Sequence, residues 1–363
     1  MISEVIIRHI YRFFFLVLAS YGIFYFSYKY YIPWPGHNDY NQYYPMYVEP
    51  LDFDKAQSPF VYRQLSAVVV NMLYETGIFY PNEIQFVSSA YDQRVFFSVL
   101  LSNYLALLLT AMIVGMSVSR LVKRNTLLPP LLAELLCFTA FFTQRGVLTE
   151  MTEGWSWFLI ALGFYAYLNR RLWMTILVLL LSIFQRETIP LIFGVFSVLD
   201  WAIDSWQEPS KKTSRFFIWI FVGAVFSFGS YLVMRTVLFP VAEYGSGTQL
   251  DMRTMLANLM HFGVDIFSFN LSRELVFQGF ITQNTYLILG LTVLMCMYTH
   301  RRQLGDFLLK KSYFVQITSA LLLLDLVGIA AGIGNNIGRI AAVLTPVIAV
   351  YSVVLMTDLD AKS

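Results

Sequence analysis

Long apolar runs, with most charges at or between their ends, dominate the sequence. One of them extends from Val95 to Val118 and ends at a cluster of basic residues. About 20 consecutive apolar residues are enough for a helix to cross the hydrocarbon core of a bilayer. Charged residues make up only 13% of the chain, against about 25% in typical soluble domains. The sequence therefore predicts an all-α, polytopic integral membrane protein.

The same pattern divides the whole chain, 1–363, into one transmembrane domain with about ten spans. Two long polar segments, 33–94 and 240–283, are expected to be loops on one side of the membrane. A short tail follows the last apolar run, and no repeat or separate soluble domain is visible. The expected spans are 13–32, 95–118, 127–143, 155–168, 172–184, 188–203, 216–239, 284–298, 313–331 and 340–356.

Basic residues gather at alternate turns between these spans. Cytoplasmic loops carry an excess of Lys and Arg, so the side with these turns is expected to be the cytoplasm. Both termini then lie in the cytoplasm, and the two long loops lie outside. A bacterial inner membrane is the expected location, although the same topology fits an endoplasmic reticulum protein. The basic turns are Arg8/Arg12, Arg120/Lys123/Arg124, Arg170/Arg171, Lys211/Lys212/Arg215 and Arg301/Arg302/Lys310/Lys311.

The first outer loop contains the signature of an amphipathic helix. Ser58 is a good capping residue and Pro59 suits the first helical position. Apolar residues then recur at helical spacing, with Arg63 on another face, where it can meet either lipid headgroups or a site. We expect this helix to lie along the membrane interface. Its apolar positions are Val61, Leu65, Val68 and Met72.

Two of the expected spans, 172–184 and 188–203, are short for a bilayer. Their connecting turn carries Arg186 and Glu187, and charges at membrane depth need partners because an unpaired ion costs several kcal/mol. The spans can therefore be half-helices around a cavity. The charged turn is either a structural ion pair or a substrate contact.

Three further polar clusters fall on the outer side. The stretch Gly36-His37-Asn38-Asp39 follows the first span, and Asp39 could act as a general base for an acceptor hydroxyl. Such a stretch is also ordinary turn material. His37 and Asn38 are expected as substrate contacts beside this aspartate.

The second cluster contains Arg145, Glu150 and Glu153. The two glutamates would share one face of a helix, where paired carboxylates can grip sugar hydroxyls, divide acid and base roles, or bind a divalent metal. Alternatively, the two glutamates are solvated residues at the start of a helix, where their negative charge interacts favourably with the helix dipole. No cofactor motif is present, and the four histidines are too scattered to predict a metal site.

The third cluster, 332–339, combines glycines with Asn335, Asn336 and Arg339. Backbone amides at a helix start together with an arginine form an anion site, here at the depth of a lipid phosphate. The simpler alternative is a flexible turn whose arginine reaches the interface. Arg235 and Asp325 lie near or within other spans, and we interpret each as structural.

The arrangement resembles the GT-C superfamily of integral membrane glycosyltransferases. Members have a cytoplasmic N-terminus, a large first outer loop with interface helices, and a catalytic aspartate near the start of that loop. Asp39 in Gly36-His37-Asn38-Asp39 and the helix beginning Ser58-Pro59-Phe60-Val61-Tyr62-Arg63 occupy these places. The family often has two adjacent acids, whereas this chain has Asn38-Asp39.

The resemblance implies a transferase that moves a sugar from a polyprenyl-phosphate donor to a glycan or lipid acceptor, with inversion. It implies Asp39 as base. Substrate contacts would come from His37, Asn38, Arg63, Arg145, Glu150, Glu153, Arg186, Glu187, Asn335, Asn336 and Arg339. Membrane lipids are the other expected partners, and a net charge of only +2 predicts no nucleic-acid surface.

Other classes stay open. An O-antigen polymerase or ligase would rely on the late outer loop, which offers Arg253, His261 and Arg273. A secondary transporter would fit the short spans and the intramembrane Asp325. A membrane acyltransferase lacks its early Arg-Asp motif here, and a noncatalytic scaffold has little need for four polar clusters on one side.

Overall fold

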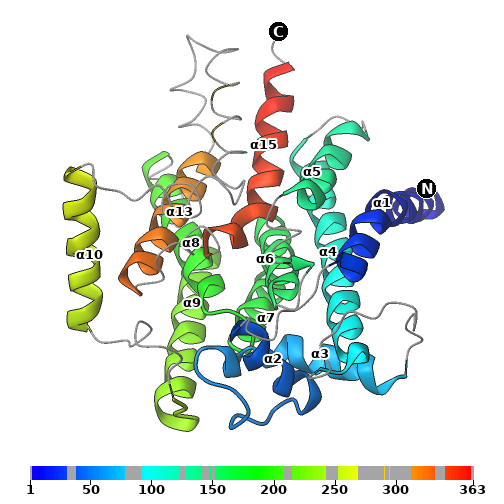
Figure 1. The fold of residues 1–363 in the computed structure, drawn as a ribbon. Coiled ribbons are helices and arrows are strands. Elements are labelled where there is room, and N and C mark those ends of the chain that lie inside the picture. Colours follow the sequence, from blue (N-terminus) through cyan, green and yellow to red (C-terminus); the bar gives the residue numbers. More distant parts are fainter. Residues whose placement is uncertain are drawn as a thin grey trace.

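The computed structural model describes residues 2–30, 38–77, 91–122, 127–140, 147–148, 152–207, 215–242, 252–268, 290, 294, 312–331 and 340–360. Within these ranges the chain is helical and contains no strand, which confirms the all-α prediction. The helices form an elongated bundle, with α10 set to one side (Figure 1).

Four described helices contain stretches long and apolar enough to cross a membrane. The stretches are His9–Lys29, Gln93–Leu121, Thr188–Ser205 and Arg215–Leu238. They belong to α1 (Ile2–Tyr30), α4 (Gln93–Leu121), α8 (Thr188–Gln207) and α9 (Arg215–Val233), the last extended by the π-helix η3 (Met234–Leu238).

Shorter helices complete the bundle. They are α5 (Leu128–Thr139), α6 (Glu153–Leu168), α7 (Leu172–Ser182), α10 (Met252–Phe267), α13 (Ser312–Ala330), η6 (Ala342–Leu344) and α15 (Thr345–Asp360). Seven of the ten expected spans thus coincide with helices that begin within a few residues of their predicted positions. The expected span 284–298 lies outside the described residues.

Helix α4 is the centre of the bundle. It packs against α1, α5, α6 and α15, and 72% of its apolar stretch is buried, compared with 17% for α1. Small side chains allow the neighbouring backbones to approach closely, as in other membrane bundles. One such approach is at Gly154 of α6, where an added Cβ would lie 3.1 Å from the Cα of Asn103.

The helix ends sort into two groups. At one end, Arg170 lies 3.8 Å from Asp204 and its guanidinium stacks over Phe217, so the α6–α7 turn meets the end of α8 and the start of α9. The last turn of α4 also points toward this end (Figure 1). The other end holds the first residues of α4, α6 and α8 and the last residues of α9.

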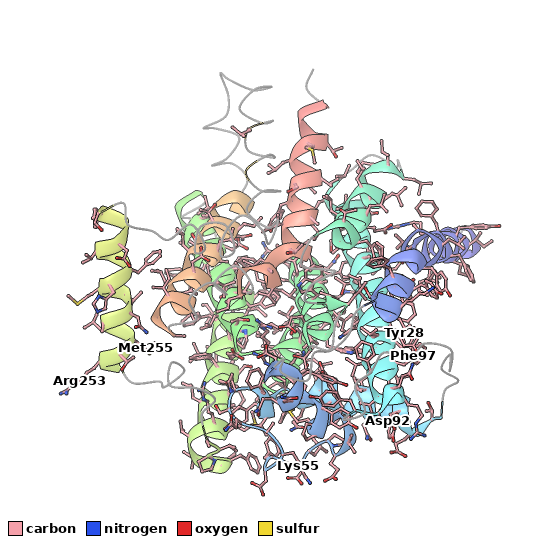
Figure 2. The ribbon with its side chains drawn as sticks, in the orientation of Figure 1. Tyr28, Lys55, Asp92, Phe97, Arg253 and Met255 are labelled. Atoms are coloured by element: carbon pink, nitrogen blue, oxygen red, sulfur yellow. The ribbon has the colours of Figure 1, made fainter. Side chains whose placement is uncertain are left out.

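The first polar segment crosses this second end. It forms α2 (Asn38–Val48), the short 3₁₀-helix η1 (Phe60–Tyr62) and α3 (Gln64–Glu75), all at the lower end of the bundle in Figure 1. Asn71 joins the two helices by donating to the carbonyls of Tyr47 and Val48 at 3.1 and 3.0 Å. Lys55 and Asp92 mark this end in Figure 2.

The amphipathic helix starts later than its sequence signature predicts. Pro59 precedes a 3₁₀ turn, and α3 itself begins at Gln64, after Arg63 breaks the helical path with a ψ of 48°. Ser66, Ala67 and Val70 of α3 are buried, whereas Met72, on the predicted apolar face, is exposed. The sequence did not predict helix α2, because the residues that begin it have the composition of a turn.

Candidate functional site

The turn between α7 and α8 carries two buried polar side chains, Gln185 and Arg186. Arg186 in this turn is 5% exposed, and its Nη1 donates to Oε1 of Glu153 at 2.9 Å. Glu153 begins α6 and is only 2% exposed in its side chain. A guanidinium and a carboxylate buried this deeply are stable only as a pair, because each alone would keep its full desolvation cost.

Gln185, one residue earlier, connects three elements through its amide. Its Nε2 donates to the carbonyl of Thr152 at 2.7 Å and to Oγ of Ser156 at 3.1 Å. Its Oε1 accepts from Oγ and the backbone N–H of Ser66 at 2.8 and 3.2 Å. The start of α3, the start of α6 and the α7–α8 turn are therefore held together by a single buried side chain.

Arg63 lies at the start of α3 and is 7% exposed. Its Nη1 donates to the hydroxyl of Tyr43 on α2, and its guanidinium lies 5.9 and 5.8 Å from the ring centres of Tyr43 and Phe60. Cation–π contacts of this kind stabilise a buried guanidinium by about 1–2 kcal/mol. The arginine faces the protein interior here, which decides against the lipid-facing alternative.

The end of α9 completes the cluster. The hydroxyl of Tyr62 donates to the carbonyl of Phe239 at 2.7 Å, with the carbonyl of Arg235 at 3.3 Å. Tyr231, four residues before Arg235, is buried, and its ring centre lies 5.8 Å from that of Tyr62. π-Helical turns such as η3 are frequent at functional sites because they re-aim side chains.

Two buried hydroxyls lie beside the ion pair. Thr152 and Thr188 are 0% and 2% exposed, and neither Oγ1 has a hydrogen-bond partner within the described part of the chain. Buried polar atoms normally have a partner. The cluster can therefore accept further hydrogen bonds from a ligand or water, in addition to those that hold it together.

Asp39 lies in the first turn of α2 and is partly buried. It precedes Tyr43 by one helical turn, so both residues are on one face of α2. The neighbouring Tyr40 is fully buried against Tyr91, with ring centres 4.8 Å apart. Asp39 is thus positioned by a helix, and not by a free loop, on the side that Arg63 contacts.

The site prediction can be compared with this arrangement residue by residue. Glu153 and Arg186 form an ion pair, and Glu187 follows Arg186 in the same turn. Arg63 precedes α3, whose first turn docks on that turn through the Leu65–Phe184 bond. Asp39 lies one helical turn before Tyr43, whose hydroxyl accepts from Arg63. Asn38 begins α2. The remaining predicted residues lie outside the described ranges: His37, Arg145, Glu150, Asn335, Asn336 and Arg339.

Sequence reasoning missed several residues of the cluster. Tyr43, Tyr231 and Gln185 belong to no recognisable motif. Arg235 was interpreted from the sequence as a structural charge. A signal did exist for Gln185, because a polar residue next to Arg186 between two apolar runs has to find hydrogen bonds. Nothing comparable marks Tyr43 or Tyr231 among the many tyrosines of the chain. The described residues contain no group of three His, Cys, Asp or Glu side chains that could hold a metal ion.

A polar contact next to the site fixes α3 against α4. Asp92 caps α4 by accepting from the N–H of Arg94 at 2.8 Å, and the hydroxyl of Tyr74 donates to its Oδ2 at 3.3 Å. Burial raises the pKa of Asp92, but hydrogen bonds from Arg94 outweigh it, so the pKa falls below the ordinary 3.8. Burial also raises the pKa of Tyr74.

Comparisons with protein-family models, with curated proteins and with solved structures gave no match to this chain.

Proposed function

We propose that the chain is an integral membrane glycosyltransferase. It moves a sugar from a polyprenyl-phosphate donor to a glycan or lipid acceptor at the outer face of a bacterial inner membrane, with both termini in the cytoplasm. The observation that carries the proposal is the buried Arg186–Glu153 pair, which lies beside a polar segment that carries the buried Arg63 across the helix ends. Buried charges in a membrane protein mark functional sites by default.

The proposed chemistry is a single inverting displacement. The acceptor hydroxyl oxygen attacks the anomeric carbon, and the bond from that carbon to the donor phosphate oxygen breaks. Asp39 takes the acceptor proton, and polyprenyl phosphate leaves with the electron pair. One carboxylate is sufficient for such a step when the leaving group is a good one.

The remaining residues have binding roles in this proposal. Arg63 lies near the phosphate and stabilises the negative charge that develops on it. Arg145, Asn335, Asn336 and Arg339, outside the described ranges, are proposed to add donors to the same phosphate. Glu150, Glu153 and Glu187, together with His37 and Asn38, orient sugar hydroxyls and arginine side chains. Arg186 holds Glu153 in place.

The test uses Asp39→Asn in the purified protein, because this change removes the base while keeping the shape of the side chain. Transfer from polyprenyl-phosphate sugars to glycan and lipid acceptors is measured by radiolabel. We expect a rate loss of about 100-fold or more, as is typical when a general base is removed. Asp54→Asn, an exposed aspartate in the same polar segment, is the matched control.

Other outcomes point to other classes. Full activity in Asp39→Asn together with loss in His261→Gln would contradict the proposal and favour the polymerase or ligase class, since His261 is exposed on α10. Solute counterflow in vesicles without sugar transfer would favour a transporter.

A further inference from the structure

Leu51, in the turn that follows α2, has a backbone conformation that leucine rarely adopts. Its φ is 67°, in the left-handed region that crowds the Cβ of most residues and where glycine or asparagine is usual. The turn is fixed, because the N–H of Leu51 donates to Oε1 of the buried Gln64 at 2.8 Å. The leucine side chain is nevertheless 62% exposed, so packing against the described residues does not offset its steric cost.

The same turn is attached to the end of α9. The ring of Phe53 stacks on that of Phe239, with the ring centres 4.0 Å apart and the planes 7° from parallel. A few residues later, the N–H of Ser58 donates to the carbonyl of Ala242 at 3.0 Å. Two contacts of different kinds therefore hold the turn against the chain that leaves α9.

The end of α9 indicates how deep this turn lies in the membrane. The apolar stretch Arg215–Leu238 has 24 residues. A helix of that length is about 36 Å long, compared with about 30 Å for the hydrocarbon core. Counted from Arg215 at its basic end, its last turn therefore reaches the boundary between acyl chains and headgroups. Val237 and Leu238 in this last turn are 67% and 61% exposed, as side chains that face lipid would be.

Charged side chains of the turn suit the headgroup side of this boundary. Nζ of Lys55 lies 2.6 Å from Oε2 of Glu49 and 3.9 Å from Oδ2 of Asp52, and all three side chains are exposed. Lys55 lies at the same extreme of the bundle as the end of α9 (Figure 1, Figure 2). An apolar side chain next to exposed charges is the arrangement of segments that lie in a membrane interface.

We propose that Leu51, together with Val237 and Leu238, forms a membrane anchor whose occupant is the acyl chains of phospholipids in the leaflet at the end of α9. Transfer of the leucine side chain from water to hydrocarbon offsets the steric cost of its backbone. The surface continues the exposed apolar side of α9, which argues for lipid over a protein partner. The anchor holds the first polar segment at the membrane surface, and it does not depend on the proposed reaction.

Photo-cross-linking tests this surface directly. A diazirine analogue of leucine is introduced at position 51 of the full-length protein, in nanodiscs of phosphatidylethanolamine and phosphatidylglycerol. After irradiation, mass spectrometry should find phospholipid adducts on the peptide that contains this position. The matched control has the same analogue at the exposed Asp54. It should give about tenfold fewer adducts, because the transfer energy of one leucine side chain corresponds to at least that ratio.

A fluorescent label measures the depth independently. Bimane is attached to Leu51→Cys or to Asp54→Cys, each in a Cys296→Ser background, and Cys137 is buried and should not react. The quenchers are iodide in water and phosphatidylcholine with a doxyl group high on its acyl chain. We expect the doxyl lipid to quench the label at position 51 and iodide to quench the label at position 54.

Two results would overturn the anchor. Equal quenching by iodide at positions 51 and 54 would place Leu51 in water. Cross-links from position 51 to a second copy of the chain or to another protein, without lipid adducts, would make the surface a protein interface. Because Leu51 is exposed, its variants should unfold at the wild-type temperature in detergent, which separates loss of lipid contact from loss of the fold.

Discussion

The backbone N–H of Leu65 donates a 2.9 Å hydrogen bond to the carbonyl of Phe184. This bond joins the first turn of α3 to the α7–α8 turn, two segments that are far apart in the sequence. It places Ser66 against Gln185 and Arg63 close to the end of α9. The candidate site thus depends on docking a polar segment onto helix ends, and its stability should depend on the few bonds that hold this segment.

Replacing Gln185 with methionine should destabilise the protein. The change keeps the side-chain volume but removes the partners of Ser66, Thr152 and Ser156, and buried polar groups without partners cost about 1–3 kcal/mol. Thermal unfolding in detergent should therefore occur at a lower temperature. Gln93→Met is the control, because Gln93 is partly exposed and its Nε2 makes a longer bond of 3.3 Å to Tyr28. If Gln185→Met and Gln93→Met lower the unfolding temperature equally, the proposed role of Gln185 is contradicted.

The pair Arg186–Glu153 should behave as a unit. Either Arg186→Met or Glu153→Gln leaves one buried charge without its partner, at an expected cost of about 3–5 kcal/mol. The double variant removes both charges and should be more stable than either single variant. A double-mutant cycle of unfolding free energies measures the coupling. Additive effects of the two changes would show that the residues do not interact.

Gly154 should not tolerate a methyl group. In Gly154→Ala the added Cβ would lie 2.7 Å from Oδ1 and 3.1 Å from Cα of Asn103, and the backbone of α4 cannot move away freely. Overpacking of this kind costs about 1–3 kcal/mol. Gly22→Ala provides the comparison, because its Cβ meets nothing within 4 Å and the helix should gain about 0.5–1 kcal/mol. Opposite shifts in melting temperature are therefore expected.

Acid should weaken the cap of α4. The pKa of Asp92 is lower in the folded protein than its ordinary value of 3.8, because hydrogen bonds from Arg94 outweigh burial. Asp92 therefore contributes stability above that value, and the contribution is lost as the pH falls through the lower pKa of the folded state. Melting temperatures measured between pH 6 and the most acidic pH tolerated should fall less steeply in Asp92→Asn. Parallel curves would argue against this contribution.

Much of the fold follows from the sequence. The lengths of the apolar runs and the positions of the basic turns predicted α4, α8 and α9. These signals are strong because a helix in lipid must form all of its backbone hydrogen bonds internally. The start of α3 could not be placed in the same way. Ser58 and Pro59 suggest a helix start, but the contacts of Arg63 with Tyr43 and Phe60 favour a break there, and those contacts exist only after folding.

The candidate site was predictable only in part. Charges near helix ends are visible in the sequence, and Arg186, Glu153 and Glu187 could be grouped by the side of the membrane they face. Which charge pairs with which could not be known, because Glu150 and Glu153 were equally plausible partners. The apolar groove between α8 and α9, lined by residues within 190–199 and 221–229, was invisible as well, since such a lining is indistinguishable in sequence from residues that face lipid.

The crossing segment also sets the order in which the molecule can be completed. Residues 38–77 are synthesised early, yet their partners Phe184, Gln185 and Phe239 emerge much later. On a translating ribosome the segment must wait, without its contacts to these partners, until the helix ending at Leu238 has been made. A chain truncated before that point would contain the polar residues of the site but could not close it.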